Sequence, residues 1–353
     1  MPTRLIDLQN DPDPRARLDE AARCVADGGL VAFPTETVYG IACNRDDEAA
    51  VERLIEVKDR PPEKQFSVHI GSLEQVGQHV KTVPLVARRL MDRCWPGPLT
   101  IIIEARDGGT VGLRYPKNEP ACYMIRKAGV PVIAPSANPS GQPPATDANM
   151  VMDYLDGKVD IVIDDGPTPF GKSSTVVRIT RDGYELLREG ALGPRSLQWA
   201  ANKIILFVCT GNTCRSPLAE AICRKMLADR MEVKPTELVN HGYTVASAGI
   251  FAGFAQGASP EAVRVGREMG CDLSGHLTQR VTAQMLHDAD VVYCMSRGHL
   301  ENLLQVAPTE AGKMALLDPD GRDVVDPMGG DLDRYRRCGR FIRKALEQRL
   351  ADV

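Results

Sequence analysis

The sequence lacks several features that would fix a compartment or a partner by themselves. No apolar run approaches the ~20 residues that cross a bilayer, and the longest, such as Ile204–Cys209, are far shorter. Its first residues hold no apolar segment of the kind found in secretory signals. Acidic residues outnumber basic ones, 47 to 43, so bulk charge does not favour a nucleic-acid platform. We therefore expect a cytoplasmic protein that does not enter the membrane.

Two further absences concern paired cysteines and glycine-rich nucleotide motifs. The 10 cysteines are scattered without a CxxC pair, which, with no export signal, favours reduced thiols. Neither GxxxxGKS/T nor GxGxxG occurs, so any nucleotide site must be built differently. The length of 353 residues is too great for one ordinary domain and suits two.

Both halves alternate predicted strands with predicted helices, most clearly in the C-terminal half. Residues 203–209 and 243–249 are typical of buried strands, whereas 217–230 has the spacing of an amphipathic helix. A second helix is expected over 259–270, with Ser259 as its N-cap. This alternation predicts an α/β fold with parallel strands and helices on both faces of the sheet.

The predicted domain boundary lies where glycine and proline interrupt the alternation. Gly193 and Pro194 mark the interruption, and a new strand begins shortly afterwards. We therefore expect a first domain over 1–195, a linker over 196–202 and a second domain over 203–353.

The clearest chemical motif is a cysteine followed by five residues and an arginine. Cys209 ends a predicted strand, Arg215 closes the loop, and Pro217 opens a helix. Backbone amides at a helix N-terminus lower the pKa of a thiol and bind a phosphate dianion, which the arginine can clamp. The pattern therefore predicts a nucleophilic cysteine in an anion-binding loop. The other residues of this loop are Thr210, Gly211, Asn212, Thr213, Cys214 and Ser216.

Residues 203–350 resemble the low-molecular-weight protein phosphatases. The resemblance rests on the cysteine loop and on the strings SAG, ADVVYCMSRGH and DVVDPMGG. It implies a doubly wound, four-stranded parallel sheet with a phosphate-binding loop and no metal or other cofactor. It also implies that Cys209 attacks phosphorus while Asp326 protonates the leaving group and then activates water against the cysteinyl-phosphate.

The substrate class depends on residues beside the cysteine and after the general acid. Thr213 resembles the protein-arginine-phosphatase branch, because tyrosine-directed members typically carry a larger aliphatic residue there. Met328, Gly329 and Gly330 lack the aromatic wall that stacks on a phenol ring. An aromatic residue there is usual in the arginine branch as well, so Met328 counts against both, and the preference rests on Thr213 together with the DPxGG tail. We therefore favour phosphoarginine in a phosphoprotein as the substrate, with a tyrosine-specific phosphatase as the alternative.

The other cysteines of this half bear on two points, the role of Cys214 and the possibility of arsenate reduction. Cys214 either forms a protective disulfide with Cys209, as the resemblance implies, or is a small buried hydrophobe. Thioredoxin-coupled arsenate reduction shares the loop but needs a downstream pair of resolving cysteines. Cys271, Cys294 and Cys338 are too widely separated to resemble that pair.

In the first half, scattered basic and hydroxyl residues indicate an anion site. Lys58, Arg60 and Lys64 cluster after a predicted helix and suit a triphosphate, whereas the isolated Arg114 could hold a carboxylate. A turn at 136–140 offers hydroxyl and amide groups. By themselves these residues predict only an anion-binding α/β domain.

Residues 15–192 resemble the YrdC-like threonylcarbamoyl-AMP synthases. The strings that carry the resemblance are FPTETVYG, KDRPPEK, FSVHI, WPGPLT, VGLRYP, APSANPSGQPPAT and SSTVVR. It implies a twisted mixed sheet and an enzyme that forms threonylcarbamoyl-adenylate and pyrophosphate from L-threonine, bicarbonate and ATP. It further implies Mg²⁺ with ATP, double-stranded RNA binding, and a tRNA-modifying transferase complex that uses the adenylate for N6-threonylcarbamoyladenosine.

The same resemblance assigns site residues by position. The ATP-binding residues it implies are Lys58, Arg60, Lys64, Thr110, Ser136, Asn138 and Arg188. The threonine-binding residues it implies are Thr37, His69, Arg114 and Ser174. Pro144 departs from the pattern, because many relatives carry there a serine that touches ATP.

Together the two halves predict a bifunctional enzyme, a threonylcarbamoyl-AMP synthase followed by a cysteine-dependent phosphatase. The alternative from another class is an N-terminal half that only binds RNA. Pyrophosphate release that depends on ATP and threonine discriminates between the two.

Overall fold

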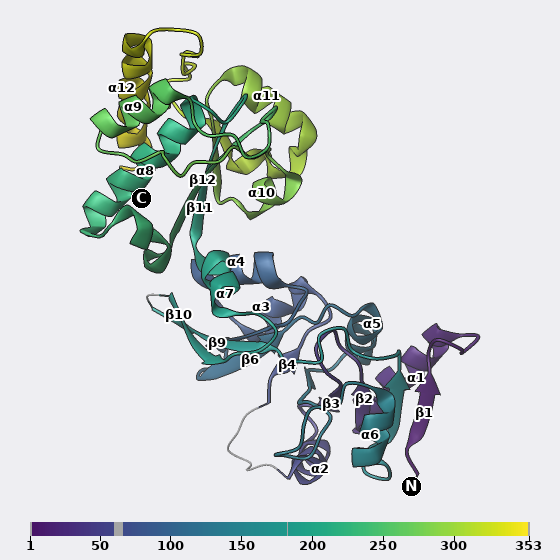
Figure 1. Cartoon of the computed structure of the whole chain (residues 1–353). Coiled ribbons are helices and arrows are strands. Elements are labelled where there is room, and N and C mark those ends of the chain that lie inside the picture. The colour runs from purple at the N-terminus through teal and green to yellow at the C-terminus, as the bar shows by residue number, and fades with distance from the viewer. Residues whose placement is uncertain (1, 60–65, 182, 352–353) are drawn as a thin grey trace. The chain divides into compact units, whose positions relative to one another are not determined.

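The computed structural model describes residues 2–59, 66–181 and 183–351. The chain divides into two compact units, Met1–Ala201 and Asn202–Val353 (Figure 1). Each is an α/β unit built on a sheet of its own, and the predicted fold class of both is confirmed. In the described part of the chain no helix is both long and apolar enough to cross a membrane.

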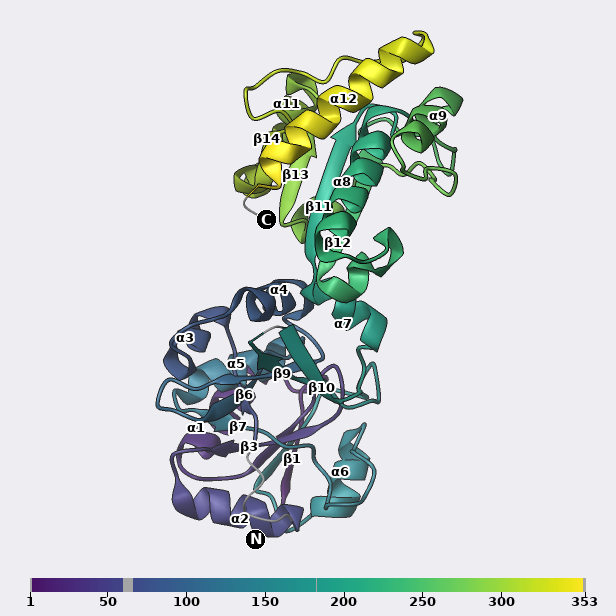
Figure 2. The same cartoon turned by 90° about the vertical axis from the view of Figure 1, so that its left-hand side faces the viewer.

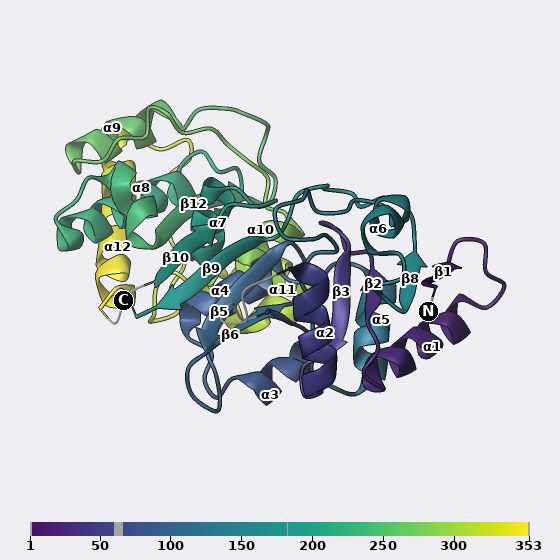
Figure 3. The ribbon, with the colours of Figure 1, turned by 90° about the horizontal axis from the view of Figure 1, so that it is seen from below.

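Unit 1 is built on a ten-stranded mixed sheet in the order β1-β8-β2-β3-β7-β4-β6-β5-β9-β10. Strands β3, β2, β8 and β1 lie side by side in Figure 3. The strands are β1 (Arg4–Asp7), β2 (Val31–Phe33), β3 (Gly40–Asn44), β4 (Val68–His69), β5 (Leu99–Glu104), β6 (Thr110–Arg114), β7 (Val132–Ile133), β8 (Ile161–Asp164), β9 (Thr175–Thr180) and β10 (Gly183–Arg188). The helices are α1 (Pro14–Ala26), α2 (Glu48–Lys58), α3 (Val76–His79), α4 (Leu85–Cys94), α5 (Glu119–Ala128), α6 (Ala148–Leu155) and α7 (Pro194–Ala201), with a 3₁₀ turn at Leu73–Gln75.

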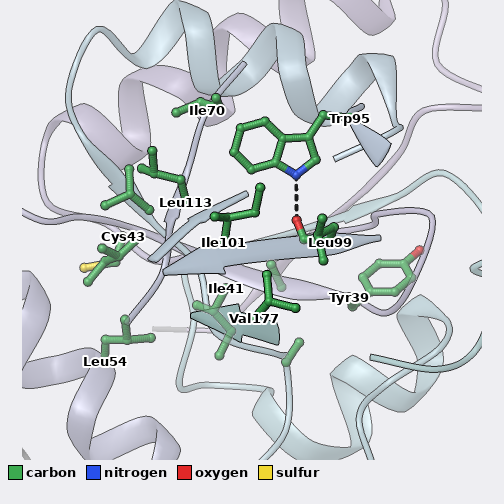
Figure 4. Packing of buried hydrophobic residues seen from close by; sticks show 14 of the residues in the cluster. Tyr39, Ile41, Cys43, Leu54, Ile70, Trp95, Leu99, Ile101, Leu113 and Val177 are labelled. Carbon is green, nitrogen blue, oxygen red and sulfur yellow. Dashed lines mark hydrogen bonds between the residues drawn. The ribbon is translucent and has the colours of Figure 1, made fainter. Parts of the chain in front are cut away.

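Alternation along the strands places an apolar cluster on each face of this sheet. In β3, Ile41 and Cys43 join one cluster with residues of α2, α4, α6 and α7, whereas Ala42 joins the other with residues of α1 and α5. Figure 4 shows the first cluster, in which the indole Nε1 of Trp95 donates a hydrogen bond of 2.7 Å to the carbonyl of Leu99. Strands β2, β3, β7 and β8 therefore pack against apolar residues on both faces of the sheet.

Unit 2 contains a four-stranded sheet, β12-β11-β13-β14, in which all neighbours are parallel. Its strands are β11 (Lys203–Cys209), β12 (Tyr243–Gly249), β13 (Val291–Cys294) and β14 (Met314–Leu316). Its helices are α8 (Arg215–Met231), α9 (Pro260–Glu268), α10 (Ala283–Asp288), α11 (Arg297–Val306) and α12 (Leu332–Arg349), with 3₁₀ turns at Pro235–His241 and Pro308–Lys313.

Helices cover both faces of the second sheet, as the sequence predicts. Ile205 and Phe207 of β11 pack in a cluster with residues of α8, α9 and α12, whereas Leu206 packs in a second cluster with residues of α10 and α11. Figure 2 shows α8 and α12 over the same sheet. This is a doubly wound arrangement in which β11 is central and its carboxyl end carries Cys209.

The segment 196–202, interpreted from the sequence as a linker, lies largely within α7. Leu197, Ala200 and Ala201 recur at helical spacing and are buried in the core of unit 1. Pro194 does not interrupt structure here but occupies the first position of the helix, where its missing N–H costs nothing.

Candidate active sites

A cavity of about 270 Å³ opens in unit 1 where β4, β5, β6 and β9 meet. Its lining residues are Thr35, Val38, Tyr39, Gly40, Phe66, Ser67, His69, Thr100, Ile102, Arg114, Ala134, Pro135, Ser136, Ser173, Ser174, Val176 and Arg188. Of the residues predicted for the synthase site, His69, Arg114, Ser136, Ser174 and Arg188 therefore lie around one cavity.

Arg114, the last residue of β6, is the buried cation of this cavity. Its Nη2 donates to Glu36 Oε1 at 3.1 Å, to Thr35 Oγ1 at 3.2 Å and to Thr37 Oγ1. Its Nε is buried and has no hydrogen-bond partner among the described residues. Burial lowers the pKa of the guanidinium, and Glu36 opposes that shift. A buried guanidinium in the wall of a cavity suits an anionic ligand such as a carboxylate.

Glu36 is a site residue that the sequence analysis did not single out. Its Oε1 pairs with Arg114, its Oε2 accepts from the backbone N–H of Lys117 at 2.9 Å, and it is 4% exposed. The signal was present in the string Thr-Glu-Thr, where a charged residue lies between two buried threonines. Its partner, however, is 78 residues away, and sequence spacing does not show such a pair.

His69 lies beside Arg114 across paired strands, because β4 and β6 are parallel with these two residues in register. Burial first, and then the charge of Arg114, lower the pKa of His69 to about 3. Its Nδ1 lies 3.4 Å from the carbonyl of Ser67. The ring is therefore neutral at physiological pH and contributes a hydrogen-bonding group rather than a charge.

Hydroxyl groups form the opposite wall. Ser174 Oγ lies 2.9 Å from Thr100 Oγ1, and Arg188 Nη2 donates to the carbonyl of Ser174 at 2.9 Å and to its Oγ at 3.2 Å. Thr110, at the exposed start of β6, is not among the lining residues of this cavity.

Of the predicted basic cluster Lys58, Arg60 and Lys64, the structure describes Lys58. Lys58, the last residue of α2, is 4% exposed, and its Nζ donates to the carbonyl of Ser136 at 2.6 Å, to the carbonyl of Asn138 and to Asn138 Oδ1 at 3.2 Å. Lys58 thus holds the turn that carries Ser136 at the cavity. Arg60 and Lys64 lie outside the described residues.

The second site is the loop between β11 and α8. Cys209 Sγ lies 2.9 Å from Ser216 Oγ and accepts the backbone N–H of Asn212 at 3.2 Å. Cys209 is 3% exposed, so its sulfur is shielded from bulk water. One backbone donor and one hydroxyl group thus lie against this sulfur.

Asn212 fixes the shape of this loop. Its φ of 56° lies in the left-handed region, which asparagine tolerates better than most residues. Its Nδ2 donates to Ser216 Oγ at 3.0 Å and to Ser247 Oγ at 2.8 Å, and its Oδ1 accepts from the N–H of Gln279 at 3.0 Å. His276 Nε2 lies 2.8 Å from its carbonyl. Ser247, His276 and Gln279 were not predicted as site residues.

Arg215 and Asp326 meet beside the loop although 111 residues separate them. Arg215 Nη2 donates to Asp326 Oδ2 at 2.6 Å and to Thr210 Oγ1 at 3.3 Å. The carboxylate is oriented by the N–H of Met328, which donates to Oδ1 at 3.1 Å. The predicted nucleophile, cation and general acid thus come from one region of unit 2.

Cys214 is 3% exposed and packs in the core cluster of α8. Its Sγ lies 3.3 Å from Tyr335 Oη and 3.4 Å from Ser259 Oγ, and it is a free cysteine, as is Cys209. Its neighbour Thr213 is half-buried beside it, with Oγ1 3.5 Å from the sulfur.

Comparisons with known proteins agree with this division. Residues 23–190 match the Sua5/YciO/YrdC family model, described as telomere recombination, and residues 204–353 match the low-molecular-weight phosphotyrosine protein phosphatase model. A threonylcarbamoyl-AMP synthase of Pyrococcus abyssi is 42% identical over 192 residues, which are 50% of this chain and 56% of that protein. One of Cellvibrio japonicus is 33% identical over 167 residues, 45% of this chain and 86% of that protein. The solved structure of a doubly substituted P. abyssi Sua5 is 28% identical, covers 70% of this chain and 91% of that chain, and gives a TM-score of 0.53.

The fold and the two sites define a two-domain α/β protein with one buried-arginine cavity and one cysteine loop. The chain belongs to the threonylcarbamoyl-AMP synthase family through its first unit, and its second unit is a low-molecular-weight phosphatase domain. It spans 56% of the length of the P. abyssi relative.

Proposed function

We propose that unit 1 forms threonylcarbamoyl-AMP and pyrophosphate from L-threonine, bicarbonate and ATP. The observation that carries the proposal is the buried Arg114, a cation in the wall of a cavity that is also lined by hydroxyl groups. The activity named for the relatives of this unit supports it.

In this proposal the threonine carboxylate binds Arg114, which Glu36 holds in place. The hydroxyl group of Thr35 and the neutral ring of His69 complete that side of the cavity, and the hydroxyl group of Thr37 supports Arg114. ATP binds toward Ser136 and Arg188, and Ser174 belongs to the threonine side. The amine of threonine first combines with bicarbonate to form a carbamate and releases water. A carbamate oxygen then attacks the α-phosphorus, the bond to the bridging oxygen breaks, and pyrophosphate leaves.

Mg²⁺ would accompany ATP and neutralise charge on its phosphate groups. No group of three or more His, Cys, Asp or Glu side chains suited to a metal occurs in the part of the chain that the structure describes. The proposal therefore has the phosphate groups of ATP, not a protein cluster, hold the ion. Exclusion of water from the cavity would protect the adenylate from hydrolysis.

The test is pyrophosphate release by the full chain with ATP, threonine and bicarbonate, omitting each in turn. We expect release to require all three and to fall strongly in Arg114→Lys, because a lysine cannot offer the same planar donors. Arg178→Lys, at an exposed arginine paired with Glu185 and outside the cavity lining, is the matched control. Absence of release at saturating substrates would leave the RNA-binding alternative for this unit.

We propose that unit 2 is a protein phosphatase that uses Cys209 as nucleophile. The supporting observation is the sulfur placed 2.9 Å from Ser216 Oγ and 3.2 Å from the Asn212 amide, with Arg215 in the same loop. Sulfur attacks phosphorus as the bond to the leaving group breaks, and Asp326 gives its proton to that group. Water, losing a proton to Asp326, then attacks phosphorus and releases phosphate and the thiolate.

Arg215 must change partners during this reaction. In the structure it is paired with Asp326 at 2.6 Å. A bound phosphate would take over the guanidinium in bidentate form, and Asp326 would be released to act as the acid.

We favour phosphoarginine over phosphotyrosine as the substrate. Thr213 is a small hydroxyl residue in the loop, and Gly329 and Gly330 follow the Asp-Pro pair. The exposed Met328 favours neither substrate. The measurement is kcat/KM on matched phosphoarginine and phosphotyrosine peptides, for the natural chain and Thr213→Ile. A phosphoarginine preference lost in the variant supports the proposal; a phosphotyrosine preference unchanged by it contradicts the proposal.

The product of unit 1 defines the partner we propose. Threonylcarbamoyl-adenylate is reactive and would pass to a tRNA-modifying transferase complex in the cytoplasm. Direct binding of double-stranded RNA is a separate part of the proposal, which an electrophoretic shift with a tRNA stem would test.

A further inference from the structure

A line of side chains leads from the phosphatase loop to a buried histidine. His299, near the start of α11, is 8% exposed, and its Nε2 lies 2.9 Å from Thr210 Oγ1. Its Nδ1 lies 2.8 Å from Oγ of Ser296, the N-cap of the same helix. Thr210 Oγ1 in turn accepts from Arg215 Nη2 at 3.3 Å. The string Ser-Arg-Gly-His contains both the histidine and the serine of this line, and the sequence analysis gave it no role of its own.

The direction of each hydrogen bond follows from the donors available. A guanidinium can only donate, so Thr210 Oγ1 is the acceptor toward Arg215. The single hydrogen of that hydroxyl is then free to point at His299 Nε2, which must be the unprotonated nitrogen. The ring proton therefore lies on Nδ1 and is donated to Ser296 Oγ.

The electrostatic surroundings agree with a neutral ring. Burial first, and then the positive charge of Arg215, lower the pKa of His299 to about 4, while Asp326 and Asp323 act in the opposite sense. A protonated ring would present Nε2–H to the threonine oxygen and break the order of donors just described.

We propose that His299 is a positioning residue for the phosphatase reaction, which orients the Thr210 hydroxyl and thereby holds Arg215 toward the bound phosphate. The inference rests on the phosphatase function proposed above. Arg215 has two other partners, Asp326 Oδ2 and the carbonyl of Val324 at 3.4 Å. When phosphate binding draws Arg215 from Asp326, Thr210 becomes the polar side chain that keeps the guanidinium in the loop.

The experiment uses the full chain with p-nitrophenyl phosphate and measures kcat/KM together with the inhibition constant of inorganic phosphate. In His299→Ala we expect both to worsen about tenfold, the size of one lost hydrogen bond. His299→Gln should recover most of the loss, because its Oε1 can accept the Thr210 hydrogen. His287→Ala, a histidine paired with Glu310, should match the natural chain.

A double-mutant cycle separates positioning from simple structural support. Thr210→Val removes the hydroxyl and keeps the shape, so its effect should not add to that of His299→Ala if one acts through the other. Additive losses, or a glutamine variant as poor as the alanine variant, would overturn the inference. If His299→Ala does not fold, an unimpaired Thr210→Val would overturn it as well.

Measurements on the natural chain distinguish a failure of the proposed phosphatase function from a failure of the role proposed for His299. Inactivity of the natural chain toward p-nitrophenyl phosphate contradicts the phosphatase function itself. Activity of the natural chain that is matched by every variant contradicts only the role of His299.

Discussion

Each unit contains a buried arginine paired with a carboxylate, and the two pairs differ in one respect. Arg114 and its partner Glu36 have side chains that are 7% and 5% exposed. Arg215 is 8% exposed, but its partner Asp326 is 46% exposed. A carboxylate that shares the burial of its arginine is a permanent partner, because separating them would leave a buried charge. An exposed carboxylate can leave its arginine and take part in proton transfer.

The prediction with the largest effect tests whether the two sites act independently of each other. Cys209→Ser should reduce phosphatase turnover to background, because a serine hydroxyl is a far poorer nucleophile than a thiolate. Pyrophosphate release by unit 1 should be unchanged. Both activities are measured on one preparation, and a joint loss in a folded variant would mean that the units are coupled.

The second prediction concerns the permanent pair. Glu36→Gln should lower the free energy of unfolding by about 3–5 kcal/mol, because it leaves Arg114 buried without a counter-charge. Both tryptophans of the chain, Trp95 and Trp199, belong to unit 1, so their fluorescence during denaturant unfolding reports on that unit.

The matched control for this measurement is Asp326→Asn. The exposed carboxylate belongs to unit 2, so this substitution should leave the tryptophan transition in place. If Glu36→Gln lowers the free energy of unfolding by less than about 1 kcal/mol, the distinction between the two pairs is contradicted.

The third prediction sharpens the role of the exchangeable carboxylate. Asp326→Asn should slow turnover of phenyl phosphate by about 10²-fold, because phenolate leaves poorly without a proton. With p-nitrophenyl phosphate, whose leaving group is more acidic, the loss should be smaller. Equal losses on both substrates would show that Asp326 is not the general acid.

The last prediction concerns the pH dependence of the stability of unit 1. The pKa of His69 is lowered to about 3 in the folded chain, so between that value and its ordinary range the unfolded state binds the additional proton. This contribution to stability is present at neutral pH and is lost as the pH falls through the window. In His69→Gln the tryptophan transition should vary less with pH over that window than in the natural chain; an unchanged slope would contradict the assignment.

How much of these sites could be predicted depended on sequence distance. The loop from Cys209 to Arg215 is contiguous, and its strand, turn and helix are visible as one pattern. The pair of Arg114 with Glu36 is not contiguous in the sequence, because it forms only when two distant segments meet at β6. His299 lies in a string that carries the resemblance, but the role that we propose for it depends on its contact with Thr210 Oγ1, which sequence spacing does not predict. Pro194 was misinterpreted because proline occurs both in turns between elements and at the first position of a helix, where it lies here.

The junction between the units has a practical consequence for dividing the chain. α7 ends at Ala201, β11 begins at Lys203, and the single residue between them, Asn202, donates through Nδ2 to the carbonyl of Val239 at 2.9 Å and to Thr244 Oγ1 at 3.2 Å. A protease therefore meets no extended exposed stretch at this point. Halves produced separately should be cut after residue 201, because a cut at 195 would leave the first half without the helix that closes its apolar core.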